Sequence, residues 1–233
     1  MKSKNKINID IEKNLKIFKD GDAIKNKGMD PNERYASFDY CFNYFQTFKE
    51  NNKIEELASK NNLQQSCLQL GFYLASWGML RGSSFLLEKS VRYYATLIKG
   101  IVGFDKKIWD IDADSYSDEN IELLLLCKNM IYEALGGKEK DPSDILTTKI
   151  MLGVFGNIPA FDSYFKKGFR VHYCKENQLK KIAEFYKDNK GIINMHSKRI
   201  HTFDFLSGKE TKRKYTKAKI IDMIGFIEGQ NIG

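Results

Sequence analysis

The chain has few of the residues that form disulfides or bind metals, and few prolines. Its 233 residues include only three prolines, three histidines and four cysteines. The cysteines stand singly, without a CxxC motif or a Cys/His cluster: Cys41, Cys67, Cys127 and Cys174. This spacing argues against a structural zinc site and against a disulfide framework. We therefore expect buried, reduced thiols, a reducing cytoplasmic setting, and no metal or other cofactor.

A segment long enough to cross a membrane is also missing. The most apolar stretch, residues 68–80, spans 13 residues and contains Gln69 and Ser76, whereas a membrane helix needs about 20. The N-terminal segment KSKNKINIDIEKN lacks the apolar core of a signal peptide. The chain has no P-loop, GxGxxG, GxSxG or kinase-like string. We expect a soluble protein with no membrane partner.

The residues that are abundant favour helices. Apolar residues make up 42% of the chain and charged residues 29%, a balance typical of globular proteins. The chain shows no internal repeat, no βαβ alternation and no convincing strand pair. We predict an all-α fold, a compact multi-helix protein of about nine to eleven helices. Residues 1–30 are predicted to form a polar lead-in with one short helix at 9–18, and residues 31–233 a single all-α domain, or two lobes at 31–135 and 136–233.

Two predicted helices carry most of the aromatic and glycine residues of the N-terminal half. Pro31 is expected to open the first, whose aromatic stripe is more often core than a base-stacking surface. In the second, small residues follow helical spacing: Gly71, Ala75, Gly78 and Gly82. Such a seam lets a neighbouring helix approach closely, so we expect this apolar helix at the centre of the fold.

The turn after this glycine seam has two interpretations. Arg81, Ser83 and Ser84 form either an anion-binding turn or a simple bend before a further helix at residues 85–101. The bend is the more economical interpretation, because two core helices must be connected at this point in any case.

The acidic segment at residues 109–120 resembles a calcium loop only in part. Its sixth position is Ser115 and its twelfth is Ile121, where glycine and glutamate are needed. We therefore predict a loop in which Ser117 caps a helix that ends at Gly136. A second capped helix is expected from the Asp141-Pro142-Ser143 segment to about Phe155. Three more are expected at residues 176–187, 192–203 and 215–227.

Charge is distributed unevenly along the chain, whose formal net charge is +8. Residues 166–219 contain 16 Lys/Arg against 5 Asp/Glu, an excess of +11, and residues 105–144 contain 11 acids against 5 bases, an excess of −6. A field of one sign is typical of proteins that bind an anionic partner, most often nucleic acid. A Lys-rich solvated surface is the alternative.

The segment TTKIMLGVFGNIPAFDSYFKKG, residues 147–168, is the only place where residue order itself suggests chemistry. An apolar helix ends at Gly156, a turn with a proline follows, and Asp162 precedes an aromatic and basic helix. This order resembles one segment of the helix-hairpin-helix DNA glycosylase superfamily, although the glycine hairpin of that family is missing. The resemblance implies a role for Asp162 as the carboxylate that helps to expel a flipped base. The alternative is that Asp162 only caps the following helix.

The leading hypothesis is a nucleic-acid-binding protein, a divergent DNA glycosylase-like enzyme that acts on a flipped base, with DNA as the expected partner. The expected phosphate contacts come from three segments of the basic third: Lys166, Lys167, Arg170, Lys198, Arg199, Lys212, Arg213 and Lys214. Lys149 lies closer to Asp162 in the sequence than the lysine of bifunctional glycosylases does, so lyase chemistry is not expected. The rival hypothesis is a non-catalytic helical interaction or regulatory module, of a phage, mobile-element or defence type.

Overall fold

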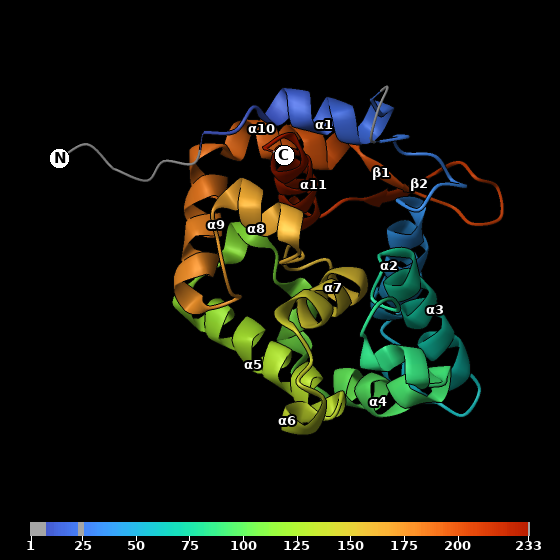
Figure 1. Cartoon of the computed structure of the whole chain (residues 1–233). Coiled ribbons are helices and arrows are strands. Elements are labelled where there is room, and N and C mark those ends of the chain that lie inside the picture. Colours follow the sequence, from blue (N-terminus) through green and yellow to red (C-terminus); the bar gives the residue numbers. More distant parts are fainter. Residues whose placement is uncertain (1–7, 23–25, 233) are drawn as a thin grey trace.

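The computed structural model describes residues 8–22 and 26–232. In these residues the chain is all-α, with one small two-stranded sheet (Figure 1). The α-helices are α1 (Ile11–Asp20), α2 (Ala36–Glu50), α3 (Leu63–Ser76), α4 (Ala95–Gly103), α5 (Asp118–Ala134), α6 (Gly137–Lys140), α7 (Asp144–Phe155), α8 (Ser163–Phe169), α9 (Glu176–Asp188), α10 (Lys190–Arg199) and α11 (Lys217–Asn231). The short elements are the 3₁₀ helices η1 (Ile54–Ala58), η2 (Phe85–Glu88), η3 (Val91–Tyr94), η4 (Lys106–Asp110) and η5 (Ala113–Ser115), and the antiparallel strands β1 (His201–Phe203) and β2 (Glu210–Lys214).

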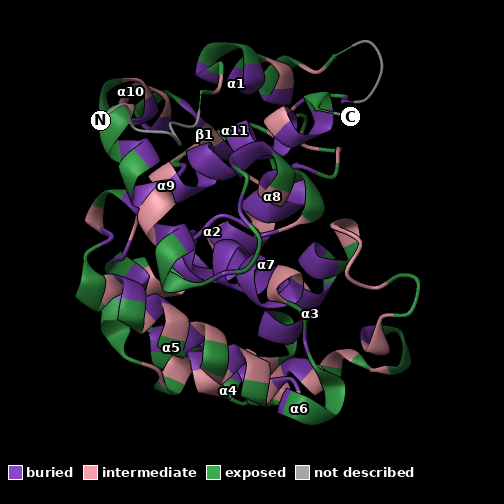
Figure 2. Ribbon diagram, turned by 60° about the vertical axis from the view of Figure 1, so that its left-hand side comes forward, coloured by how far each residue is buried: buried purple, intermediate pink, exposed green. Residues whose placement is uncertain are grey.

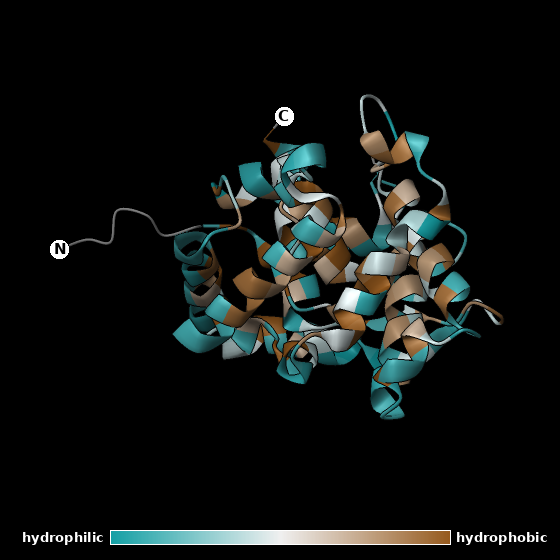
Figure 3. Ribbon diagram, turned by 90° about the horizontal axis from the view of Figure 1, so that it is seen from below, coloured by the Kyte–Doolittle hydropathy of each residue, from teal (hydrophilic) through white to brown (hydrophobic). Residues whose placement is uncertain are grey.

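The most deeply buried helices are α7 and α11. Every residue of α7 from Leu146 to Phe155 is buried, and α11 is buried continuously from Ala218 to Ile227. The remaining helices surround α7 in Figure 1, and Figure 2 shows buried residues concentrated on these central elements. The hydropathy colouring of Figure 3 shows teal segments mainly around the periphery. A helix that is apolar on all sides belongs in such a position.

The ends of α7 follow the sequence signals that predicted them. The Ser143 hydroxyl accepts a hydrogen bond from the Leu146 amide at 3.3 Å, and Gly156 ends the helix in the left-handed conformation at φ +67°. Ser117 caps α5 in the same way, accepting from the Asn120 amide at 3.2 Å. The predicted starts of both helices, the end of α7, and the glycine turn at Gly136 after α5 are therefore confirmed.

The predicted glycine seam on a single central helix is wrong. Helix α3 ends at Ser76, and both Gly78 (φ +74°) and Gly82 (φ +60°) lie in turns with left-handed backbone. These two glycines serve turn conformation, which L-residues adopt at a cost. Helix α3 is also not central, because Phe72 on it is 69% exposed. Of the seam, Gly71 does meet a neighbour closely, the Tyr94 ring.

A close glycine-mediated helix contact exists elsewhere, between α8 and α11. A Cβ on Gly168 would lie 2.4 Å from the Gly225 carbonyl oxygen, and a Cβ on Gly229 would lie 1.9 Å from the Tyr164 carbonyl oxygen. The two backbones therefore touch where side chains are missing. This contact fixes α8, and with it Asp162, against the core.

Three other expectations differ from the structure. Helix α2 begins at Ala36 because residues 31–35 form turns, in which the Pro31 carbonyl accepts from the Tyr40 hydroxyl at 2.5 Å. Residues 85–101 are two 3₁₀ helices followed by α4, where one continuous helix was predicted. Residues 200–214 form a β-hairpin, where the sequence indicated no strand pair.

The predicted N-terminal helix is present as α1 and packs on the core. Its Leu15 and Phe18 side chains are buried, and Asn14 donates to the Ile224 carbonyl of α11 at 3.4 Å. The N-terminal residues 1–7 of the predicted lead-in lie outside the described residues. No helix in the described part of the chain is long and apolar enough to cross a membrane.

Candidate functional site

Asp162 lies in the wall of a cleft of about 380 Å³. The cleft is formed by the turn after α3, by α7 and by the start of α8, with single residues from the segment before α2 and from α11. Its lining includes charged, aromatic, aliphatic and hydroxyl side chains: Arg34, Trp77, Arg81, Ile145, Lys149, Asp162, Ser163, Tyr164 and Phe226. Sites for small organic ligands have volumes of about 300–1,000 Å³, so the cleft is large enough for a nucleobase.

The two carboxylate oxygens of Asp162 have different partners. Oδ1 accepts the Phe165 amide at 2.9 Å, as the N-cap of α8, and Oδ2 accepts from the Lys149 ammonium at 3.2 Å. The side chains of Lys149 and Asp162 are 5% and 14% exposed. The cap predicted as the alternative role of Asp162 is therefore present, and it occurs inside a cleft that also contains a buried cation.

Hydrogen bonds from backbone amides to side chains of the central helices hold the turn that carries Asp162. The Ala160 amide donates to the Asp222 carboxylate at 2.9 Å, and the Phe161 amide donates to the Thr148 hydroxyl at 2.9 Å. Thr148 belongs to α7 and Asp222 to α11, so both central helices position the turn. A carboxylate held from two sides in this way is pre-organised, and it loses little freedom when a ligand binds.

Trp77 forms the aromatic wall of the cleft. Its ring stacks on Tyr35 with centroids 5.5 Å apart and meets Phe226 edge-on at 5.8 Å. The Lys149 ammonium lies 4.8 Å from the Trp77 centroid, and the Arg34 guanidinium lies 5.4 Å from it. Cations at these distances are attracted by the ring quadrupole. The cleft thus places two cations and an aromatic ring next to a carboxylate.

A buried ion pair lies next to the aromatic wall of the cleft. The Lys219 ammonium donates to the Asp222 carboxylate at 2.8 Å and lies 4.5 Å from the Phe38 ring centroid and 5.7 Å from that of Trp77. Both charged side chains are almost fully buried. Because Asp222 also receives the Ala160 amide, this pair links α11 to the turn before Asp162.

The predicted anion turn is divided by the structure. Arg81 lines the Asp162 cleft, and its side chain folds over Gly78, where a Cβ would come within 2.8 Å of its Nε atom. Ser84 instead caps η2, donating to the Met79 carbonyl at 2.7 Å and accepting from the Leu86 amide at 3.3 Å. Ser83 is exposed and lies outside the cleft lining. Of the three residues, only Arg81 is brought to the carboxylate site.

The predicted phosphate contacts fall into two separate groups. Lys166 and Lys167 lie on α8, and Arg170 ends that helix with left-handed backbone at φ +52°. The second group is placed on the last turn of α10 and on β2, which lies beside α2 (Figure 1): Lys198, Arg199, Lys212, Arg213 and Lys214.

Arg213 is engaged within the protein. Its guanidinium donates to both carboxylate oxygens of Glu50, at 3.0 and 2.6 Å, and to the side-chain oxygen of Asn43 at 2.8 Å. A bidentate pair of this kind fixes the hairpin on α2. The neighbouring Lys212 and Lys214 are exposed.

The acidic loop anchors α11. Asp112 accepts the amides of Lys217 and Ala218 at 2.9 and 2.8 Å, and Lys217 also lies 3.2 Å from Asp114. The pKa of Asp112 is raised, because the effect of burial outweighs the lowering by these hydrogen bonds and by Lys217. Within residues 8–22 and 26–232, no group of three or more His, Cys, Asp or Glu side chains could hold a metal ion.

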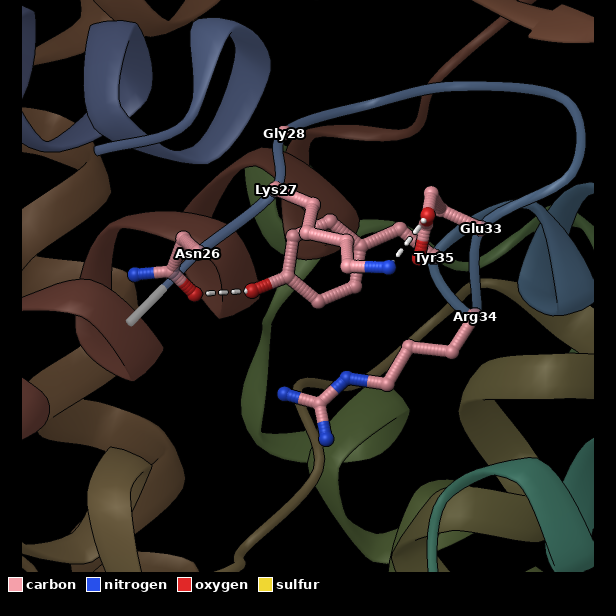
Figure 4. Close-up of a pocket in the computed structure, with 6 residues that line it drawn as sticks. All are labelled: Asn26, Lys27, Gly28, Glu33, Arg34 and Tyr35. Atoms are coloured by element: carbon pink, nitrogen blue, oxygen red, sulfur yellow. Dashed lines mark hydrogen bonds and ion pairs between the residues drawn. The ribbon is translucent and has the colours of Figure 1, made fainter. Parts of the chain in front are cut away.

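A second cavity, of about 260 Å³, lies on the other side of Arg34 (Figure 4). In this cavity Lys27 pairs with Glu33 at 2.9 Å, and the Tyr35 hydroxyl donates to Asn26. Figure 4 shows the Arg34 guanidinium extending away from the Lys27–Glu33 pair. Arg34 lines both cavities, and its guanidinium lies 5.4 Å from the ring centroids of both Tyr35 and Trp77.

Sequence reasoning identified Asp162 and Arg81 but missed most of the groups around them. Lys149 was considered only as a lyase lysine, although a lysine in the apolar run TTKIMLGVF indicates a buried partner. Arg34, Trp77 and Phe226 carry no local signal, because they come from distant segments. No family model, no curated protein and no solved structure matches this chain.

Proposed function

We propose that this protein binds nucleic acid and accepts an extruded nucleotide in the Asp162 cleft. The observation that carries the proposal is the position of Asp162 in one cleft with Trp77, Lys149 and Arg81. The half-buried Trp77 ring can pack against an extruded base, and the exposed Arg81 can bind a phosphate beside it. The excess of basic residues in the C-terminal third supports an anionic partner.

The chemistry that this arrangement supports best is hydrolysis of an N-glycosidic bond. Water adds to the anomeric carbon while the bond to the base breaks, and the base leaves with the bonding electron pair and takes up a proton. Asp162 would accept the proton of the attacking water and stabilise positive charge on the sugar. This is the role that the resemblance to helix-hairpin-helix glycosylases implies for the residue.

Lys149 has a positioning role in this proposal. It holds Oδ2 of Asp162 at 3.2 Å, while the Phe165 amide holds Oδ1 at 2.9 Å. The carboxylate therefore presents its remaining lone pairs to the cleft in a fixed orientation. We expect no Schiff base on Lys149, so borohydride treatment in the presence of abasic DNA should trap no adduct.

The first experiment is fluorescence anisotropy with two labelled DNA duplexes, one intact and one with an abasic-site analogue. We expect about tenfold tighter binding to the abasic duplex, because extruding a nucleotide from intact DNA costs a few kcal/mol. The preference should fall in Trp77→Ala. Asp162→Asn, used below to test base release, is measured in the same assay. Glu184→Gln, on the exposed face of α9, is its matched control because it makes the same change from carboxylate to amide.

Base release is measured in the same duplex format with deaminated, oxidised and alkylated bases. Asp162→Asn should lower the release rate at least 100-fold without unfolding the protein, because the amide oxygen can still cap α8. Equal affinity for the two duplexes with no base release would favour the rival function, a non-catalytic module in which Asp162 is only a cap. No binding at low salt would refute the nucleic-acid proposal altogether.

The compartment proposed for this activity is the cytoplasm. All four cysteines are free and buried in the structure, and unpaired thiols persist where the surroundings are reducing. DNA is the proposed partner because the chemistry concerns a damaged base.

A further inference from the structure

A groove of about 530 Å³ adjoins the Asp162 cleft, and Ile145 lines both. The groove lies between the C-terminal half of α5, the start of α7, α8 and the segment before α9. Its lining includes three lysines and two tyrosines: Lys128, Tyr132, Lys166, Tyr173 and Lys175. We propose that this groove binds the nucleotides that flank the one in the cleft, as a single strand. The inference rests on the function proposed above.

Tyr173 is the aromatic group of the groove that is available for stacking. Its side chain is 64% exposed, and the Lys175 ammonium lies 5.6 Å from the ring centroid. An aromatic ring left this open to solvent can accept a base on its face. The adjacent cation is positioned to meet the phosphate of the same nucleotide.

The charges in the groove favour an anionic strand. Asp144 is neutralised by Lys128 at 2.6 Å and accepts the Cys174 amide at 2.8 Å, and Asp141 accepts from the Tyr132 hydroxyl at 3.1 Å. Lys166 and Lys175 pair with no carboxylate among the described residues. Asp141 keeps its negative charge, so the three lysines and two aspartates of the groove leave a net charge of +1, with Lys166 and Lys175 positioned to bind phosphate.

The spacing of the two sites fits adjacent nucleotides. Ser163 and Tyr164 line the cleft, and Lys166 lines the groove, all on α8. Lys166 lies four positions after Asp162 in the sequence, which corresponds to about 6 Å along a helix axis. Stacked nucleotides in one strand rise about 3.4 Å each, so the next one or two phosphates come within reach of Lys166.

The test compares single-stranded oligonucleotides of increasing length, with the intact and abasic duplexes measured in parallel. We expect Tyr173→Ala to weaken binding of the longer strands about tenfold, a typical result of losing one base stack. The control is Phe72→Ala, which removes another exposed aromatic, 69% exposed on α3, that lines neither cavity. It should leave the affinity unchanged.

Salt dependence separates phosphate binding from a structural effect. The double variant Lys166→Ala Lys175→Ala should reduce the slope of log K against log salt by about 1.4, since each phosphate contact on a single strand contributes about 0.7. Lys60→Ala, at an exposed turn before α3, should leave the slope unchanged.

The outcomes distinguish the groove from the cleft. Groove variants that bind like the wild type, while the wild type still prefers the abasic duplex, would overturn the groove proposal and leave the proposed function standing. Loss of strand binding with the abasic preference retained supports the groove. A polyglutamate peptide that competes as well as an oligonucleotide of equal charge would also overturn it, because a stacking site must discriminate bases from carboxylates. No binding of any nucleic acid would refute both.

Discussion

Asp162 combines two tasks that can be separated by substitution. Its Oδ1 caps α8 and its Oδ2 neutralises Lys149, whose side chain is only 5% exposed. Alanine removes both interactions and leaves an unpaired buried ammonium, whereas asparagine retains an oxygen for the cap. We expect Asp162→Ala to lower the free energy of unfolding by about 3 kcal/mol and Asp162→Asn by about half of that.

Urea unfolding of a double-mutant cycle with Lys149→Met measures the coupling between the two residues. The double variant Asp162→Ala Lys149→Met should be more stable than the sum of the single losses indicates, because no charge is left unpaired. Strictly additive losses would show that the Asp162–Lys149 pair contributes nothing to stability.

A second buried carboxylate predicts a pH dependence of stability. Asp39 is fully buried, and burial raises its pKa from 3.8 to about 7 despite hydrogen bonds from the Tyr215 hydroxyl and the Phe203 amide. Because the folded pKa lies above the unfolded one, this residue's contribution is fully present below about pH 4. It is lost as the pH rises through 7, by up to about 4 kcal/mol.

The measurement is the urea midpoint of the wild type and of Asp39→Asn between pH 4 and 8. The difference between the two curves isolates Asp39 from the other titrating groups. The wild type should lose stability relative to the variant as the pH rises. Parallel curves would show that the hydrogen bonds keep the Asp39 carboxylate ionised across this range.

At the scale of elements, the α8–α11 contact positions the cleft and tolerates no side chain. A Cβ at residue 229 would lie 1.9 Å from the Tyr164 carbonyl oxygen, which belongs to the backbone and cannot rotate away. We expect Gly229→Ala to destabilise the protein by about 3 kcal/mol and to weaken ligand binding in the cleft. In contrast, Gly191→Ala on α10 meets nothing within 4 Å and should stabilise by up to about 1 kcal/mol. Thermal unfolding of both variants provides the comparison, and equal shifts would contradict it.

Arg213 lies in a basic segment that suggests phosphate binding, yet in the β-hairpin its guanidinium forms an ion pair with Glu50 of the same protein. Arg213 holds Glu50 and Asn43 of α2, so Arg213→Lys, which keeps the charge, should destabilise the hairpin by about 1 kcal/mol. Its salt slope for nucleic acid should not change. Amide hydrogen exchange at Tyr215, whose amide donates to the Ile200 carbonyl at 3.1 Å, reports the hairpin. Unchanged protection in the variant would show that the Glu50 pair is dispensable. The control for hairpin stability is Lys212→Ala, at an exposed neighbouring residue, which should leave the exchange protection unchanged.

These elements show which parts of the structure could be predicted from the sequence. The bounds of α7 followed from Ser143 and Gly156, because caps and left-handed glycines are local signals. The apparent seam at residues 71–82 failed because helical spacing does not reveal where a helix ends, and Gly78 was a turn. The hairpin was missed because β2 is short and its alternate residues are charged and exposed.

The residues of the candidate site also differ in whether a local sequence signal indicates them. Asp162 could be proposed from the sequence because it stands at a helix start next to a recognisable turn. Its companions Trp77, Phe226 and Arg34 come from segments on either side of α2 and from α11, and no local pattern connects them. Only the packing of α3, α7, α8 and α11 brings these residues together, which is a property of tertiary structure.

At the scale of the whole molecule, the four cysteines report whether the chain unfolds as one unit or as the two lobes considered from the sequence. Cys41, Cys67 and Cys127 lie in residues 31–135, and Cys174 lies in residues 136–233; all are buried. Burial raises the pKa of the Cys174 thiol to about 12 and raises that of the other three as well. Thiol reagents attack the thiolate, so the native protein should react with none of the four.

Pulsed thiol labelling across a urea series, with the labelled peptides identified by mass, follows each cysteine separately. We expect one shared midpoint, because α7 in one predicted lobe packs on α2, α3 and α5 in the other, and the buried side chains form a continuous core. Cooperative units of this kind open together. If Cys174 became reactive at a clearly lower urea concentration than the other three, residues 136–233 would be an independent lobe. The cleft between Trp77 and Asp162, which joins the two halves, would then depend on how the lobes dock.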